Sequence, residues 1–308
     1  MRVLPMGMAP VADRGSGRRQ LDGYVAELEA MWRGFDEIYA SLSPDDWRRP
    51  YGKDWTFADQ PFHLAYFDRA IVAAPLEAGV ALPQGERWTL RSMREIDRWN
   101  AREFAKRPAG QTPERSLAQL REAHDRIRTA LGAFSDDDLD RARVFSHFFD
   151  LGFVSLREMV EAAGLHDWGE LSELKFRLHR TAPEPPPAVT HRSVGYYLLT
   201  MRALCRPERA ERPFTVGFQM TGPGGGWWTM RVAEGACVLV EEAAQGPDLT
   251  FRMTPDIFNL AMIRRAVNPM VAMLTGRVRI RGLTRMSKFQ RLFPQPDPDQ
   301  PLTIRAAG

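Results

Sequence analysis

The chain has 308 residues, of which 44% are hydrophobic and 26% charged, a composition typical of a soluble globular protein long enough for two domains. The net charge of +3 is too small to indicate a nucleic-acid partner, because the many arginines are dispersed among acidic residues. No apolar run approaches the ~18 residues of a membrane span. The two cysteines, Cys205 and Cys237, form neither a metal-ligand spacing nor a disulfide framework, which favours a reducing, cytoplasmic location.

The first half of the chain has the periodicity of amphipathic helices. Residues 1–18, whose apolar part is broken by prolines and a glycine, are expected to be a flexible tail. Helices are predicted at 21–42, from the capping pair Thr56 and Asp59 to about 78, at 90–105, at 113–131 and at 155–179, with an irregular aromatic stretch at 142–152. Long helices with short connections predict an up-and-down four-helix bundle over residues 19–180.

The second half changes character after a proline-rich linker at residues 181–190, which can neither continue a helix nor pair in a sheet. Residues 191–308 then combine strands and helices, which predicts an α+β domain. Strands are expected at 214–220, 227–232, 237–241, 249–253 and 276–282, and helices at 193–204, 254–265, 269–274 and 287–293.

The helix predicted at 155–179 carries the strongest chemical signal. His166 and Glu170 are four residues apart and lie on the same side of this helix, with Glu170 inside the apolar stripe and His166 at its margin. A carboxylate directed at a core is costly unless something pairs with it. A metal ion would pair with both groups, and an arginine from elsewhere in the bundle is the alternative partner of Glu170.

Three further histidines are candidates. His63 faces an otherwise apolar strip, as a metal ligand or as a core histidine with a backbone partner. His124 lies in the middle of an apolar stripe, either as a satisfied core histidine or as a ligand in place of Glu170. His147 lies in the irregular aromatic segment and is expected to be structural.

Several apolar and basic residues are candidates for ligand binding. Trp99 and Asn100 line a pocket or pack, and Trp227 and Trp228 point to opposite faces of a strand, one toward the core and the other toward a ligand or the bundle. A second set lines an apolar tunnel or fills the core: Phe251, Phe258, Met262, Met270, Met273 and Leu274. Arg277, Arg279 and Arg281 form a solvated strand face or bind an acidic head group.

Residues 20–180 resemble the DinB-like superfamily of helical bundles, on WTFADQPFHLAYFDRAI around His63 and LREMVEAAGLHDWGELSEL around His166. Many members hold a divalent metal with three histidines, and this resemblance implies His63 and His166 as ligands. Glu170 stands where the third histidine usually stands. Two histidines and a carboxylate remain a sound donor set for zinc first, and for iron, nickel or manganese.

Residues 190–295 resemble the sterol carrier protein type 2 family, on FTVGF, TGPGGGWWTMRV, PDLTFRMTPDIFNLAM and LTGRVRIRGLTRMSKFQRLF. This resemblance implies a five-stranded sheet with helices around an apolar tunnel for acyl chains or sterols. The whole chain is also similar to the mycothiol-dependent maleylpyruvate isomerases. In those enzymes the pair on the last bundle helix is a glutamate followed by a histidine, and here Ala162 stands one turn before His166.

Two functions follow from these resemblances. The first is a metal-dependent transferase or isomerase that activates a low-molecular-weight thiol, or water, for addition to or isomerisation of a small organic substrate. The second is a non-catalytic binding or carrier protein for an apolar molecule or lipid, held in the C-terminal domain. Neither requires nucleic acid or stable membrane insertion, and a monomer or homodimer is expected.

Overall fold

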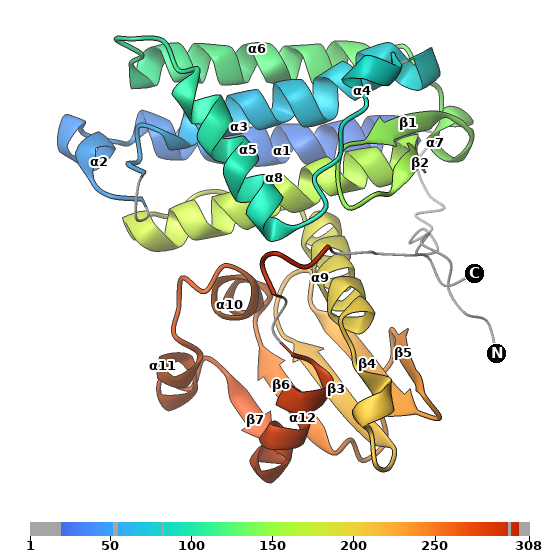
Figure 1. Cartoon of the computed structure of the whole chain (residues 1–308). Helices are drawn as coiled ribbons and strands as arrows, with labels where there is room; N and C mark the ends of the chain where they lie inside the picture. Colours follow the sequence, from blue (N-terminus) through green and yellow to red (C-terminus); the bar gives the residue numbers. More distant parts are fainter. Residues whose placement is uncertain (1–19, 52–54, 82, 295–296, 302–308) are drawn as a thin grey trace. The chain divides into compact units, whose positions relative to one another are not determined.

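The computed structural model describes residues 20–51, 55–81, 83–294 and 297–301 (Figure 1), so the tail predicted at 1–18 lies outside the described residues. The chain forms two compact units. Unit 1 comprises Met1–Ala163 and Pro298–Gly308, and unit 2 comprises Gly164–Asp297. The division falls within helix α8 (Leu156–Leu178), so this one helix contributes residues to both units.

Unit 1 is helical, as predicted. Its main helices α1 (Gln20–Ala40), α3 (Gln60–Phe67), α6 (Pro113–Gly132) and the first turns of α8 contribute to one apolar core, in which α6 contacts α1 and α3. The remaining elements are α2 (Pro44–Arg48), the π-helical η1 (Asp68–Ala73), α4 (Ala74–Ala78), α5 (Met93–Ala105), α7 (Asp138–Arg141) and the short 3₁₀ turns η2 (Gly79–Ala81) and η3 (Gln84–Glu86).

Polar caps determine where several of these helices begin. Thr112 accepts a hydrogen bond from the backbone N–H of Arg115, and Pro113 occupies the first turn of α6, as the sequence predicts. The second predicted helix begins at Gln60 and not at Thr56, because Thr56 donates from its backbone and its hydroxyl to Asp59 within a turn that precedes the helix. The same helix widens into the π-helical segment η1, which the sequence pattern did not indicate.

The stretch expected to be irregular at 142–152 takes part in an antiparallel hairpin. Strand β1 (Arg143–Ser146) pairs with β2 (Gly152–Ser155), with Val144 opposite Val154. The connection between them places Phe149 and Asp150 at positive φ, a conformation that apolar periodicity does not reveal. Pro298 and Asp299, which also belong to unit 1, bind Arg94 of α5 through a backbone hydrogen bond and a bidentate ion pair.

Unit 2 has the predicted α+β fold with a five-stranded mixed sheet in the order β5-β4-β3-β6-β7. Strand β3 (Phe214–Met220) runs parallel to β6 (Leu249–Met253) and antiparallel to β4 (Gly226–Ala233), and β5 (Ala236–Val240) and β7 (Arg279–Arg281) are the two edge strands. The predicted strand at 276–282 is therefore shorter than expected. The helical segments are α9 (Pro187–Ala203), η4 (Pro207–Arg209), α10 (Pro255–Phe258), the π-helical η5 (Asn259–Ile263), α11 (Pro269–Leu274), η6 (Leu283–Arg285) and α12 (Met286–Leu292).

Helix α9 begins six residues before the predicted start at Ser193, because Pro186 is its N-cap residue and Pro187 occupies its first turn, where a missing N–H costs nothing. In the sheet, Phe218 of β3 stacks on Phe251 of β6 with ring centroids 5.4 Å apart. Together these features confirm the predicted α plus α+β fold. No helix in the described part of the chain combines the length and hydropathy needed to cross a bilayer.

Candidate functional site

His63 lies on α3 with its side chain buried in unit 1. Its Nδ1 lies 2.6 Å from the hydroxyl oxygen of Tyr66, and the Tyr66 hydroxyl donates to Oδ1 of Asn100 at 2.8 Å. Because that hydroxyl has a single proton and gives it to Asn100, His63 is the donor in the first contact. The proton of His63 is therefore on Nδ1, and the ring nitrogen that carries the lone pair is Nε2.

The two residues predicted to line a pocket on α5 differ in environment. Trp99 is buried, and its ring packs edge-on against Tyr66 at 5.1 Å and at a tilt of 30° against Trp88 at 5.7 Å. Asn100 accepts the Tyr66 hydrogen bond and so fixes the orientation of His63 indirectly. A role for either residue in substrate binding stays a prediction.

His124 on α6 is held by two neighbours in unit 1. Its Nε2 lies 3.1 Å from Oδ2 of the buried Asp68, and its ring stacks on Trp32 with centroids 4.2 Å apart. These contacts correspond to the alternative of a satisfied core histidine. Asp68 is the first residue of the π-helical segment η1.

His147 has the structural environment expected of it. Its Nδ1 lies 2.8 Å from the carbonyl oxygen of Trp88, and its ring stacks on the Trp88 ring at 4.1 Å. Burial lowers the pKa of His147, and the hydrogen bond to Trp88 opposes this effect.

The pair predicted on α8 is formed within unit 2. Nε2 of His166 lies 3.9 Å from Oε1 of Glu170, as expected for residues one helical turn apart. The Nδ1 of the same ring lies 3.6 Å from the carboxylate of Asp167. Glu170 is buried and His166 is half-buried, so the two groups share an environment in which a charge requires a partner.

Glu170 also has an arginine partner, as the alternative reading of the sequence allowed, but this arginine comes from unit 2. Nη1 of Arg264 donates to Oε1 of Glu170 at 2.7 Å and lies 3.8 Å from the carboxylate of Glu173. Glu173 accepts a charged hydrogen bond from Nε of Arg177 at 2.7 Å. Burial raises the pKa of the nearby Tyr197, and the positive charge of Arg264 opposes this effect.

Two residues without titratable groups, Gly169 and Asn259, position Arg264, and neither was among the residues predicted from the sequence. A Cβ on Gly169 would lie 2.6 Å from Nη2 of Arg264, so the guanidinium occupies space that only glycine leaves open. The fully buried Asn259 donates to the carbonyl oxygen of Gly169 at 3.2 Å and thereby ties η5 to α8. The sequence does contain one signal for this close approach: Gly169, a poor helix former, stands between His166 and Glu170 in an otherwise good helix.

The apolar candidates of unit 2 fall into three classes. Trp228, Phe251 and Phe258 are buried, whereas Trp227, Met262 and Met273 are only half-buried. Trp227 and Trp228 do lie on opposite faces of β4, as predicted. Met270 and Leu274, considered as tunnel or core residues, instead lie on the surface with 61% and 84% exposure, because α11 buries only Ala272.

Among the described residues, two groups offer enough donor atoms for a metal ion. One comprises His63, His166 and Glu170, and the other comprises Asp68, His166 and Asp167. The first group is the set that the sequence singled out, two imidazoles and one carboxylate, and its role as a metal site stays a prediction. Such a set suits a divalent transition metal, whereas the second, richer in carboxylates, suits a harder cation.

Comparison with known proteins covers both halves of the chain. The DinB superfamily matches residues 27–174, and the SCP-2 sterol transfer family matches residues 208–294. A search of curated protein sequences found no match.

Among solved structures, mycothiol-dependent maleylpyruvate isomerase is similar to this chain with 12% identity and a TM-score of 0.46, covering 78% of this chain and 87% of that one. YfiT from Bacillus subtilis, described as a probable metal-dependent hydrolase with an unusual four-helix bundle topology, has 19% identity and a TM-score of 0.36, covering 55% and 94%. Sterol carrier protein 2 from Yarrowia lipolytica has 8% identity and a TM-score of 0.23, covering 35% and 88%. By its family matches, the chain joins a DinB-superfamily domain at residues 27–174 to an SCP-2 sterol transfer domain at residues 208–294.

Proposed function

We propose that this protein is a metal-dependent enzyme in which His63, His166 and Glu170 hold one divalent cation, with zinc as the first choice. In this proposal the metal serves the addition of a thiol or water to a small organic substrate, or its isomerisation. The observation that carries the proposal is the pair on α8, where Nε2 of the half-buried His166 and Oε1 of the buried Glu170 lie 3.9 Å apart. The match of residues 27–174 to the DinB superfamily supports it, because all three residues lie inside that match.

The protonation of His63 suits a ligand. A histidine that binds a metal through one nitrogen usually donates a hydrogen bond from the other, which fixes the tautomer and the ring orientation. Nδ1 of His63 donates to Tyr66, whose hydroxyl is in turn anchored on Asn100, so that Nε2 is the coordinating nitrogen. In this role Tyr66 and Asn100 are positioning residues.

Arg264 sets the charge state of the third ligand. Its guanidinium stabilises the carboxylate form of Glu170, which is the form that can bind a metal. A cation at Glu170 would also share this carboxylate with the guanidinium or displace it. We therefore expect Arg264 to lower the affinity for metal while it maintains the site in the metal-free protein.

A bound divalent metal would lower the pKa of a thiol or a water molecule that binds to it, and it would polarise an electrophilic group of the substrate through its oxygen. The side chains of the chain itself bind the ion, orient the imidazole of His63 and keep Glu170 ionised. Tyr197 remains protonated at neutral pH, since burial raises its pKa, and so offers a hydroxyl donor in the same unit as Glu170.

Elemental analysis of the purified full chain, combined with native mass measurement, tests the proposal. The wild-type protein should retain about one equivalent of metal, whereas His63→Ala, His166→Ala and Glu170→Ala should each lose it. His147→Asn is the matched control, because His147 is also a buried histidine of unit 1 but has a backbone partner and stacks on Trp88. Metal that is bound equally by all four variants would contradict the proposal.

The same measurement distinguishes the alternative function, a carrier for an apolar molecule. The match of residues 208–294 to the SCP-2 sterol transfer family supports that alternative. A stoichiometric co-purified lipid in a protein without metal would favour the carrier, and the enzyme proposal would then fail.

A further inference from the structure

The C-terminal part of unit 2 carries an unbalanced positive charge. Between residues 257 and 296 the sequence has no aspartate or glutamate but has eight basic residues: Arg264, Arg265, Arg277, Arg279, Arg281, Arg285, Lys288 and Arg291. The rest of the chain holds all 39 acidic residues but only 34 of the 42 basic ones, so the net charge of +3 conceals this segregation.

Two of these eight basic residues have acidic partners: Arg264 pairs with Glu170, and Nη1 of Arg291 lies 3.5 Å from Oε1 of Glu211. On unit 1, exposed arginines such as Arg121 and Arg128 pair with Asp36 and Glu29. In unit 2, five exposed arginines form no ion pair with any described carboxylate: Arg252, Arg277, Arg279, Arg281 and Arg285. Their charges are therefore available to a partner outside the chain.

The register of the sheet brings some of these charges together. Arg252 of β6 lies directly opposite Arg279 of the edge strand β7, and Thr250 lies opposite Arg281. Like charges at directly opposite positions destabilise a strand pair. An arrangement that costs stability in the isolated protein is explained if a negatively charged partner neutralises it.

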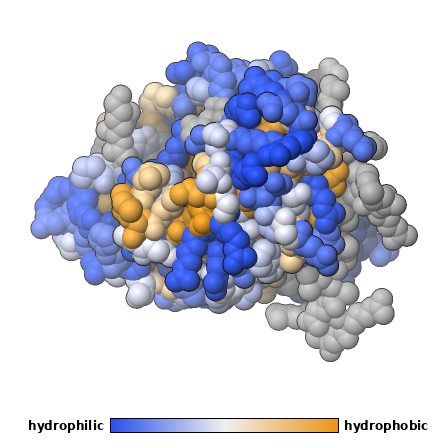
Figure 2. Space-filling model, turned by 90° about the horizontal axis from the view of Figure 1, so that it is seen from below, coloured by the Kyte–Doolittle hydropathy of each residue, from blue (hydrophilic) through white to orange (hydrophobic). Residues whose placement is uncertain are grey.

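Exposed apolar side chains lie in the same segment. Six large hydrophobic residues are exposed in the described part of the chain, and four of them are Met270, Val271, Leu274 and Leu283. The first three lie on α11, and a hydrogen bond of 3.0 Å from the N–H of Val278, the residue before β7, to the carbonyl oxygen of Ala272 joins the two elements. Figure 2 shows hydrophobic residues gathered in a patch with hydrophilic residues along its border.

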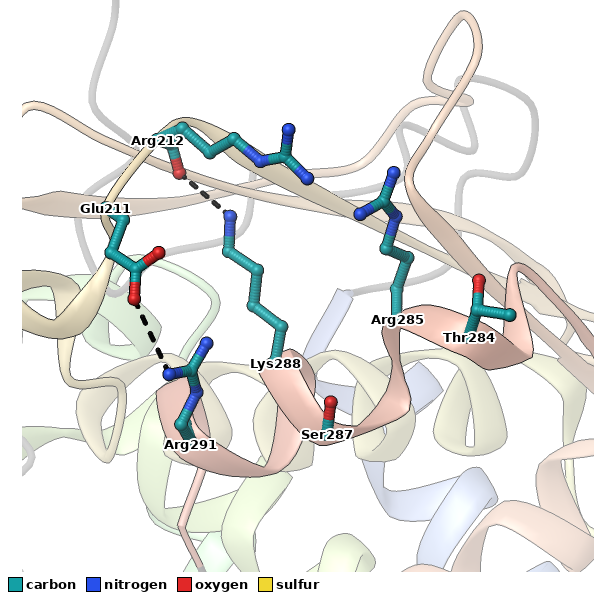
Figure 3. A pocket seen from close by; sticks show the side chains of 7 residues that line it. All are labelled: Glu211, Arg212, Thr284, Arg285, Ser287, Lys288 and Arg291. Carbon is teal, nitrogen blue, oxygen red and sulfur yellow. Dashed lines mark hydrogen bonds and ion pairs between the residues drawn. The ribbon is translucent and has the colours of Figure 1, made fainter.

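Leu283 directly precedes Thr284 and Arg285, two residues that line a basic pocket. Arg212, Arg285, Lys288 and Arg291 line it, with Glu211 as its one acidic residue, and Figure 3 shows the Arg212 and Arg285 side chains directed toward each other. Lys288 donates to the backbone oxygen of Arg212 at 3.1 Å. The pKa of Lys288 is lowered, first by partial burial and then by Arg212 and Arg285, as expected where cations crowd together.

We propose that α11, β7 and the segment from Leu283 to Arg291 form a docking surface for an anionic phospholipid bilayer. Met270, Val271, Leu274 and Leu283 enter the boundary between head groups and acyl chains, the arginines of β7 and its flanks bind the negative surface, and the basic pocket receives a lipid phosphate. Apolar side chains bordered by arginines are the combination that interfacial binding requires.

The apolar component selects a bilayer over other polyanions. A nucleic acid would bind the same cations, but it gains little from exposed aliphatic side chains and is instead contacted through stacking aromatic rings and hydrogen bonds. The exposed residues on α11 are methionine, valine and leucine. An acidic protein would need a shaped apolar groove, whereas these residues lie on a short protruding helix.

Flotation of the full chain with vesicles tests the proposal. Binding is expected to vesicles of phosphatidylcholine with about 30 mol % phosphatidylglycerol, and not to phosphatidylcholine alone, and it should fall as salt rises to about 0.5 M. Since each arginine near such a surface contributes about fivefold to partitioning, Arg279→Gln with Arg281→Gln should weaken binding on the order of 20-fold. Leu274→Asp should weaken it by about tenfold or more.

Matched controls lie on α5 of unit 1. Arg98→Gln with Arg102→Gln removes the same charge from exposed arginines, and Met93→Asp alters an exposed apolar residue. Both controls should bind as the wild type does. Equal binding to neutral vesicles, or equal losses in the control variants, would overturn the proposal.

Two further arms complete the test. Binding of short duplex DNA that is tighter than vesicle binding and insensitive to Leu274→Asp would assign the surface to nucleic acid and overturn the proposal. Because Leu274 is 84% exposed, Leu274→Asp should melt like the wild type, and Leu274→Gln is a second variant that must lose binding in the same direction.

Discussion

The partner of Glu170 allows a quantitative prediction. Replacing Arg264 with methionine keeps most of the volume of the side-chain stem and removes the charge that neutralises Glu170. Charges whose centres lie about 4 Å apart attract by about 4 kcal/mol at an effective dielectric constant of 20. The Glu170 side chain is 5% exposed and that of Arg264 is 24% exposed, so we reduce this figure for solvent screening to about 3 kcal/mol.

Urea unfolding of the metal-free protein at pH 7 measures this loss as a shift in midpoint with an unchanged slope. A double-mutant cycle with Glu170→Gln should show a coupling of about 2 kcal/mol, because the variants share one interaction. Arg252→Met is the matched control, an exposed arginine of the same unit with no ion pair to a described residue, and its expected change is below about 0.5 kcal/mol.

Zinc links this experiment to the proposed function. If zinc binds Glu170, excess zinc should stabilise Arg264→Met more than the wild type, by about 1 kcal/mol or more, because the ion replaces the missing positive charge. A variant as stable as the wild type without metal would refute the assigned role of Arg264. Equal stabilisation of both proteins by zinc would refute the competition between Arg264 and the metal.

Three further predictions concern stability. The Tyr24 hydroxyl donates to Glu161 at 2.8 Å, and burial, followed by the charge of Glu161, raises the pKa of Tyr24 to about 12. The free energy of unfolding should therefore fall as pH rises above about 10, the pKa of tyrosine in the unfolded chain. Alkaline thermal melts of Tyr24→Phe should not show this loss. Burial lowers the pKa of His147, so on acidification the unfolded chain takes up a proton at this residue at a higher pH than the folded chain does. The free energy of unfolding should therefore fall as pH drops below about 6.5. Thermal melts of His147→Asn should not show this fall. Gly282→Ala should lower the free energy of unfolding by more than about 3 kcal/mol or prevent folding, because the φ of Gly282 is +81° and a Cβ would lie 2.1 Å from the backbone oxygen of Asp248. Gly235 also has a positive φ but has open space around it, so Gly235→Ala should cost less. Denaturant titration of both variants measures the difference.

The sequence was most informative where local chemistry determines structure. A cap such as Thr112 followed by Pro113 defines the start of a helix within four residues, and the alternation along Phe214–Met220 defines a strand within seven. Both depend on nearest neighbours along the chain. The hairpin at Arg143–Ser155 was missed because its turn relies on Phe149 and Asp150 at positive φ, for which neither residue type is a strong signal.

The candidate site was predictable only in part, because some of its contacts are local in the chain and others depend on tertiary packing. The spacing of His166 and Glu170 follows from helical geometry and is present in the structure. The partner of Glu170 is 94 positions away in the chain, and only tertiary packing brings Arg264 to the space beside Gly169. The role of Tyr66 as the anchor of His63 is local, because the two residues are three positions apart on α3, and a hydroxyl at that spacing from a histidine is a signal that the sequence contains.

Helix α8 has a consequence for any attempt to study the two families separately. A fragment that ends after Leu178 would keep Glu170 and Glu173 but would lack Arg264, and its buried acid would then have to take up a proton or recruit an ion. The DinB-superfamily segment at residues 27–174 therefore depends for the charge balance of Glu170 on an arginine 94 positions downstream of that residue. Exchange of the SCP-2 family domain at residues 208–294 between relatives would need to preserve that arginine, so the Glu170–Arg264 pair constrains which fusions can fold.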